Sequence, residues 1–134
     1  ASPAYLAKHG EPQQPSDLVS HLCLRYRYPS SRRLQEWRLS QPGHAPAELT
    51  LPTAITLGSI EATRSAAVSG LGMAYLPDFA VQDALQDGSL QTTLDAYNVI
   101  EGSFWMLWPS NRFTLPKLRV WVDFLSGALG RERR

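Results

Sequence analysis

Small and apolar residues recur at helical spacing in the middle of the chain. They share one face of a predicted helix that begins after Ser59 and packs closely against a sheet: Ile60, Thr63, Ala66, Ala67 and Gly70. Ser59 suits the N-terminal cap of this helix, and Gly70 suits its end in left-handed conformation. After Gly72, which gives a tight entry, the apolar run at residues 73–77 predicts a buried, parallel-type strand.

Alternating apolar and polar positions predict further strands. In residues 22–28, Leu22, Leu24 and Tyr26 fall on one face, which is typical of a half-buried strand. The same period predicts a strand at residues 34–40, two short strands that meet at Pro52, and an edge strand at residues 89–94. The β-prone residues 103–108 predict another strand.

Capping residues mark four more helical segments. Ser2, Pro3 and Gly10 bound a short first helix. A second helical turn at residues 15–21 would bury Leu18 and Val19. A third helix begins at an Asp78 cap and ends at Gly88, and the last one carries an apolar face at Leu118, Trp121, Val122, Leu125 and Leu129. The mixture of strands and helices predicts an α/β fold.

Composition narrows the class of protein. A length of 134 residues suits one small domain or a large part of a two-lobed one. The formal charge of +1 gives no electrostatic footprint for nucleic acid. The single cysteine excludes an internal disulfide and favours a reducing, cytoplasmic location. No membrane span or signal peptide is predicted. The absence of an initiator methionine leads us to expect a piece of a longer protein, although a processed N-terminus would look the same.

Catalytic and metal-binding patterns are missing from the sequence. The glycines at 70–72 follow a helix and precede a strand, the reverse of a phosphate-binding loop. They also lack the glycine spacing of a nucleophile elbow. The histidines have no metal-ligand spacing, Cys23 is best interpreted as a packed thiol, and capping or a solvated face explains Asp78 and Asp83. We therefore expect no enzyme activity, metal or cofactor.

The carboxyl ends of two predicted strands, here called strand exits, are followed by residues that would suit a bound ligand. In open α/β sheets, ligands bind beyond the carboxyl ends of strands and beside helix N-termini. The first exit follows Tyr26, and at the second the free amides from Ser59 to Glu61 would suit a carboxylate, although an ordinary capped helix explains them equally well. A basic cluster lies beside the first exit, where it either meets an anionic ligand or forms a solvated loop, with a slight preference for the loop: Arg25, Arg27, Arg32 and Arg33.

Three motifs in fixed order resemble the effector-binding region of LysR-type transcriptional regulators. They are "ASPxYL" at the start, "GLGxAxLPDF" in the centre and "PSNRxxxPKxRxxxDFL" near the end. The resemblance implies a fold like the type 2 periplasmic binding proteins, with two α/β lobes around a cleft. Residues 1–102 then correspond to the second lobe, and residues 103–134 to a crossover strand and a helix that return to the first lobe. The rest of the first lobe and the DNA-binding domain would be absent here.

The resemblance also implies a site and partners. The positions that match cleft-facing segments of the family, residues 26–30 and 56–60, coincide with the two strand exits. Within them we expect these residues to contact the ligand: Tyr26, Tyr28, Ser30, Thr56, Gly58, Ser59 and Ile60. A small anionic or polar effector would bind there, DNA would be contacted only through the absent domain, and the intact protein would form a homo-oligomer. The last helix, with Trp121 and Leu125, would expose apolar surface that another segment or chain covers. A periplasmic solute-binding protein of a transport system is the alternative.

Overall fold

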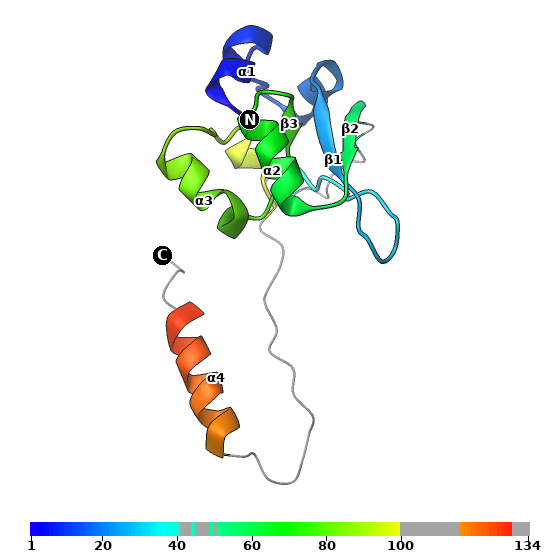
Figure 1. Cartoon of the computed structure of the whole chain (residues 1–134). Helices are drawn as coiled ribbons and strands as arrows, with labels where there is room; N and C mark the ends of the chain where they lie inside the picture. The colour runs from blue at the N-terminus through cyan, green and yellow to red at the C-terminus, as the bar shows by residue number, and fades with distance from the viewer. Residues whose placement is uncertain (41–43, 45–48, 50, 100–115, 130–134) are drawn as a thin grey trace. The chain divides into compact units, whose positions relative to one another are not determined.

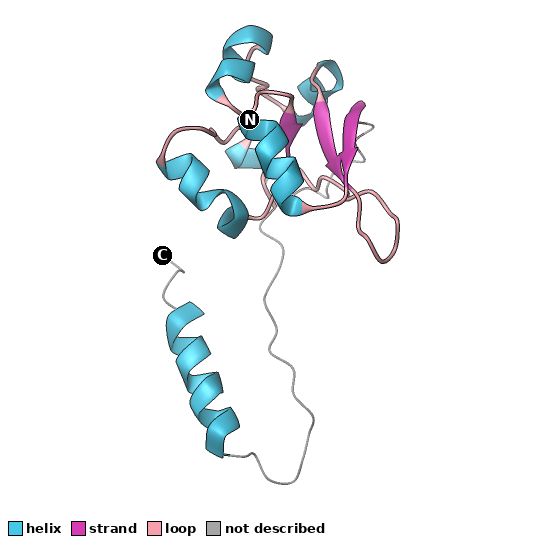
Figure 2. Cartoon of the chain, viewed as in Figure 1, coloured by secondary structure: helices cyan, strands magenta, loops and turns pink. Residues whose placement is uncertain are grey.

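The computed structural model describes residues 1–40, 44, 49, 51–99 and 116–129. The chain divides into two compact units, Ala1–Ile100 and Glu101–Arg134. The described elements, drawn in Figures 1 and 2, are α1 (Pro3–His9), the 3-10 helix η1 (Pro15–Ser20), β1 (Cys23–Tyr26), β2 (Thr53–Leu57), α2 (Ile60–Val68), β3 (Met73–Ala74), α3 (Asp78–Gln86), the 3-10 helix η2 (Asp95–Tyr97) and α4 (Pro116–Leu129).

The sheet of the first unit has the order β2-β1-β3, and both pairings are parallel. In the register, Arg25 on β1 lies opposite Thr56 on β2, while Cys23 lies opposite Met73 on β3. Parallel pairing brings the carboxyl ends of β1 and β2 to the same edge of the sheet. The predicted parallel strand after Gly72 is confirmed, although β3 is only two residues long.

The two faces of β1 enter two separate cores. Cys23 joins a cluster with Tyr5 and Leu18, whereas Leu24 joins a cluster with Ala67 on α2 and others. Successive strand residues point to opposite faces, so β1 is buried on both sides at its amino end. The strand predicted within residues 22–28 is confirmed as β1, but its amino end is buried on both faces rather than on one, because other segments cover both faces there.

Helix α2 forms as its sequence predicts. The Ser59 hydroxyl oxygen accepts a hydrogen bond from the Ala62 amide at 3.0 Å, which caps the helix. Thr63 and Ala67 are buried, and Gly70 follows the helix with φ of +76°. In Figure 1, α2 lies across the sheet with α3 beside it.

Several predicted elements are corrected by the structure. Residues 34–40 and 89–94 form no strand; the first segment has isolated bridges from Leu34 to Arg27 and from Leu39 to Asn98. Near Pro52 there is one described strand, β2, which begins after the proline, and Thr50 lies outside the described residues. Alternating apolar and polar side chains do not produce a strand unless the backbone of the segment also pairs with a neighbouring strand over several residues.

Smaller corrections concern helix ends. Val19 is 67% exposed, so of the pair predicted to be buried only Leu18 lies in the core. Pro77 occupies the cap of α3, and Asp78 is the first residue of the helix. The Asp78 carboxylate accepts a hydrogen bond from the Phe79 amide at 2.8 Å, so it still satisfies a free amide of the first turn.

The last predicted helix is confirmed as α4. Three of its apolar side chains are exposed, Val120, Trp121 and Phe124, and the Trp121 and Phe124 rings meet edge to face with centroids 6.2 Å apart. Leu125, which was expected to share the apolar surface with Trp121, is only partly exposed. The predicted strand at residues 103–108 lies outside the described residues.

The backbone of Leu22 joins α1, β1 and β3. Its amide donates to the Tyr5 hydroxyl oxygen at 2.8 Å, and its carbonyl accepts from the Met73 amide at 2.8 Å. Gly72 makes the second bond feasible, because a Cβ atom there would collide with the Leu22 carbonyl and lie 3.2 Å from Cγ of Leu24. The structure thus explains why glycine stands at the entry to β3.

Replacing Gly72 with alanine should destabilise the first unit. The added methyl meets backbone that cannot move without breaking the Met73 hydrogen bond, so we expect a loss of about 1–3 kcal/mol in the free energy of unfolding. Urea unfolding of Gly72→Ala measures it. Gly58→Ala is the matched control, since a Cβ at Gly58 would meet nothing within 4 Å. Equal unfolding midpoints for the two variants would contradict this account.

The Cys23 thiol is fully buried and contacts the carbonyl oxygens of Leu18 (3.8 Å) and His21 (3.7 Å). Burial raises the pKa of this thiol to about 11, although the nearby Arg25 charge acts in the opposite direction. The folded protein therefore favours the neutral thiol. Its contribution to stability is complete below the ordinary pKa of 9.0 and is lost as the pH rises toward 11.

The free energy of unfolding should accordingly fall between pH 9 and pH 11 more steeply in the unaltered protein than in Cys23→Ala, which has no thiol to ionise. Denaturant titrations across this range measure both slopes. The alanine variant also controls for every other group in the protein, because it differs from the unaltered protein only at residue 23. Parallel slopes would show that the thiol does not titrate with folding.

Candidate functional site

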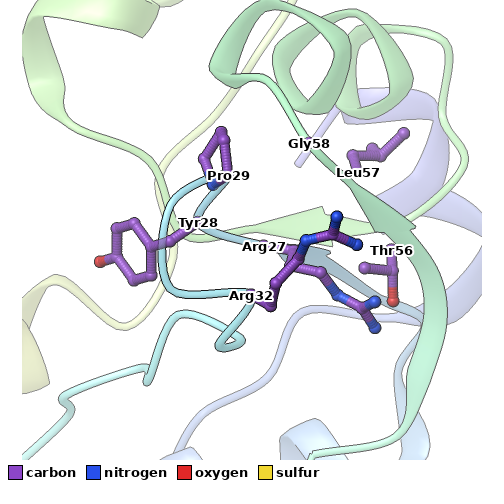
Figure 3. A pocket seen from close by; sticks show the side chains of 7 residues that line it. All are labelled: Arg27, Tyr28, Pro29, Arg32, Thr56, Leu57 and Gly58. Carbon is purple, nitrogen blue, oxygen red and sulfur yellow. The ribbon is translucent and has the colours of Figure 1, made fainter.

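A cavity of about 470 Å³ opens where β1 and β2 end and α2 is about to begin. Six of its seven lining residues are exposed and Leu57 is partly buried, so the cavity is open to solvent. Figure 3 shows the lining: Arg27, Tyr28, Pro29, Arg32, Thr56, Leu57 and Gly58. This is the strand edge at which α/β sheets bind ligands.

Backbone hydrogen bonds fix both walls of the cavity. The Arg27 amide donates to the Leu57 carbonyl at 2.8 Å, which ties the end of β1 to the end of β2. On the other side of β1, the Gln35 amide donates to the Tyr26 carbonyl at 2.8 Å, and the Arg25 guanidinium donates to the Gln35 carbonyl at 2.8 Å. The segment that returns from the cavity is thereby held against β1.

The loop at residues 28–33 closes on itself. The Tyr28 amide donates to the Arg33 carbonyl at 2.9 Å, and the Arg32 amide donates to the Tyr28 carbonyl at 2.9 Å. This closure holds Arg32 at φ of +59°, a left-handed conformation that costs a non-glycine residue roughly 1–2 kcal/mol. The fold therefore keeps an arginine at the cavity where glycine or asparagine would be less strained.

Three of the seven residues expected at the site line this cavity: Tyr28, Thr56 and Gly58. Tyr26 does not line the cavity itself but packs against Tyr28, which does. The two rings meet edge to face with a centroid distance of 5.2 Å. The Ser59 hydroxyl oxygen accepts the hydrogen bond that caps α2, and Ile60 is the partly buried first residue of that helix. Ser30 is exposed in the turn of the loop. These four residues do not line the cavity.

Four lining residues are not among the seven expected at the site, although all but Arg32 lie within the two segments that match the family's cleft: Arg27, Pro29, Arg32 and Leu57. The basic cluster was the available signal, but its four arginines behave differently. Arg27 and Arg32 reach the cavity, Arg25 is half-buried and bonded to the backbone, and Arg33 is exposed elsewhere on the loop. Only the closed loop distinguishes Arg32 from Arg33.

The two cavity arginines carry uncompensated positive charge. Neither forms a salt bridge with an Asp or Glu side chain among the residues that the structure describes. In Figure 3 both guanidinium groups extend to the side of Thr56, while the Tyr28 ring points the other way. The cavity thus has a cationic end with a hydroxyl and a less polar end formed by Tyr28 and Pro29.

Other kinds of site receive no support from the described residues. No group of three or more His, Cys, Asp or Glu side chains there is arranged to hold a metal ion. Likewise, none of the described helices is both long enough and apolar enough to cross a bilayer.

The sequence profile of the family described as "LysR substrate binding domain" matches residues 1–130. This chain belongs to that family. The HTH-type transcriptional regulator CrgA of Neisseria meningitidis serogroup C is 34% identical over 135 residues, covering 97% of this chain and 42% of CrgA. The uncharacterized HTH-type transcriptional regulator YcaN of Escherichia coli K12 is 27% identical, covering 93% of this chain and 40% of YcaN. The chain thus spans about two fifths of these relatives.

Solved structures agree with the family. The regulatory domain of CrgA from Neisseria meningitidis, a LysR-type regulator, superposes with a TM-score of 0.73 at 31% identity, covering 97% of this chain and 62% of that one. The regulatory domain of AphB from Vibrio vulnificus superposes with a TM-score of 0.71 at 23% identity, covering 96% of this chain and 62% of that one, which supports the fold alone. The LysR domain has the α/β, type 2 periplasmic-binding-protein-like fold that the sequence predicts.

Arg32→Gly and Arg33→Gly should differ in their effect on stability. Both variants gain the same glycine and therefore the same added entropy of the unfolded chain. Only Arg32→Gly removes a side chain from a residue with positive φ. We expect Arg32→Gly to be the more stable variant by about 1–2 kcal/mol. Urea unfolding of the pair measures this difference. Arg33→Gly matching or exceeding Arg32→Gly in stability would mean that the loop stores no strain at Arg32.

Proposed function

We propose that this chain is the effector-sensing part of a LysR-type transcriptional regulator. The observation that carries the proposal is the cavity at the carboxyl ends of β1 and β2, in a chain that belongs to the LysR substrate-binding family. A small metabolite would bind there and shift the balance between conformations that contact a promoter differently. Residues 1–102 would form the second lobe, and residues 103–134 a crossover strand and a helix returning to the first lobe.

The proposed site comprises the cavity together with the neighbouring positions at both strand exits. Tyr28, Thr56 and Gly58 would contact the effector directly. Tyr26 would support the Tyr28 ring from behind, while Ser30, Ser59 and Ile60 would come into contact when a first lobe closes over the cavity. Coverage of 62% of the CrgA regulatory domain is consistent with part of that domain having no counterpart in this chain.

A regulator would act as a homo-oligomer in the cytoplasm and would bind DNA through a separate domain. Its relatives CrgA and YcaN are named as HTH-type transcriptional regulators, which favours this role over the solute-binding protein of a transport system and over an enzyme. The transport protein shares the fold class, so the fold alone does not separate the two.

Gly58→Val tests the proposal. A Cβ at Gly58 meets nothing within 4 Å, so the backbone should tolerate valine while its methyl groups fill the cavity. In a metabolite panel followed by thermal unfolding, a ligand that raises the melting temperature should lose that effect in Gly58→Val. The same ligand should change output from a promoter that the intact regulator controls.

Gly127→Val is the matched control, because Gly127 also has open space around its Cβ position and is not one of the lining residues. It should keep the ligand response. Stabilisation that survives Gly58→Val, or that is unconnected with promoter output, would count against the proposed function.

A further inference from the structure

We infer that the cavity selects a small oxyanion, a carboxylate or a phosphate, held between Arg27 and Arg32. This inference rests on the proposed function and names the chemical class of its effector. Both guanidinium groups line one cavity, and neither is neutralised by a carboxylate in the described part of the chain. A planar guanidinium donates paired hydrogen bonds to carboxylate or phosphate oxygens, so two of them at one cavity match such a group.

The groups around the two arginines suit a ligand that accepts hydrogen bonds rather than a cationic ligand. Thr56 adds a hydroxyl beside the guanidinium groups in Figure 3, and Gly58 contributes backbone without a side chain. The carboxylate of Glu61, in the first turn of α2, does not line the cavity. The less polar end at Tyr28 and Pro29 leaves room for an organic body attached to the anion.

The conformation of Arg32 argues against a merely solvated loop. A surface arginine needs no strained backbone to remain hydrated, yet the loop holds Arg32 at φ of +59° through the two backbone bonds between Tyr28 and the 32–33 segment. Arg33, next along the chain, is exposed, has no positive φ and does not line the cavity. The loop therefore places one of two adjacent arginines at the cavity and leaves the other in solvent.

Matched charged and uncharged probes test the inference on the purified protein. Benzoate, its neutral isostere benzamide and inorganic phosphate are titrated to millimolar concentration while the Gly58 amide resonance is followed by NMR. Benzoate or phosphate, or both, should shift this resonance saturably, and benzamide should not. A response to one anion alone identifies which oxyanion the cavity prefers.

Variants assign the response to the two arginines. Arg27→Gln and Arg32→Gln should each weaken anion binding about tenfold or more, because each removes a charge-assisted hydrogen-bonding group. Arg32→Lys should recover part of the loss. Arg33→Gln, the matched control in the same loop, should change the affinity by no more than about twofold. Arg32→Gly should lose affinity while keeping a stable fold, which separates binding from folding.

Three results would overturn the inference. They are equal binding of benzamide and benzoate, equal losses in Arg32→Gln and Arg33→Gln, and no anion response at millimolar concentration. The proposed function is tested separately from the anion site.

A neutral metabolite that acts through Gly58 and is insensitive to Arg27→Gln would support the sensor role and contradict the anion site. Anion binding without any effect on promoter output would sustain the anion site without the sensor role.

Discussion

The position of β1 depends on the backbone of Leu22. Its amide and carbonyl are both bonded, to the Tyr5 hydroxyl of α1 and to the Met73 amide of β3. Burial lowers the pKa of His21, with a smaller contribution in the same direction from the charge of His9, and the His21 Nδ1 atom lies 3.3 Å from the Tyr5 hydroxyl oxygen. One chain of polar contacts thus fixes the amino end of the central strand inside an otherwise apolar core.

The cavity forms at the opposite end of the same strand. With β1 held at Leu22, the bond from the Arg27 amide to the Leu57 carbonyl sets where β2 ends, and Ser59 then starts α2 immediately beyond. The loop that carries Arg32 is closed by hydrogen bonds between its own residues. The buried end of the strand is therefore separate from the end that leads into the exposed residues of the cavity.

The sequence predicted the features that local chemistry determines. Ser2, Gly10, Ser59 and Gly70 mark helix ends through hydrogen bonds and backbone angles that neighbouring residues decide. The segment around Trp37 was misassigned because a strand needs a distant partner, and the structure supplies only isolated bridges. At the site, Arg32 and Arg33 are adjacent residues of the same type and differ through the closure of their loop, so residue type alone could not separate them.

The left-handed backbone at Arg32 has a consequence for protein engineering. A redesign guided by folding energy alone would choose glycine or asparagine at this position, since either relaxes the loop. The redesigned protein would have a relaxed loop and would have lost a cation from its cavity. Under the proposed role of Arg32, thermostability is therefore a poor surrogate for ligand binding, and libraries built to improve it should leave the turn after Tyr28 unchanged.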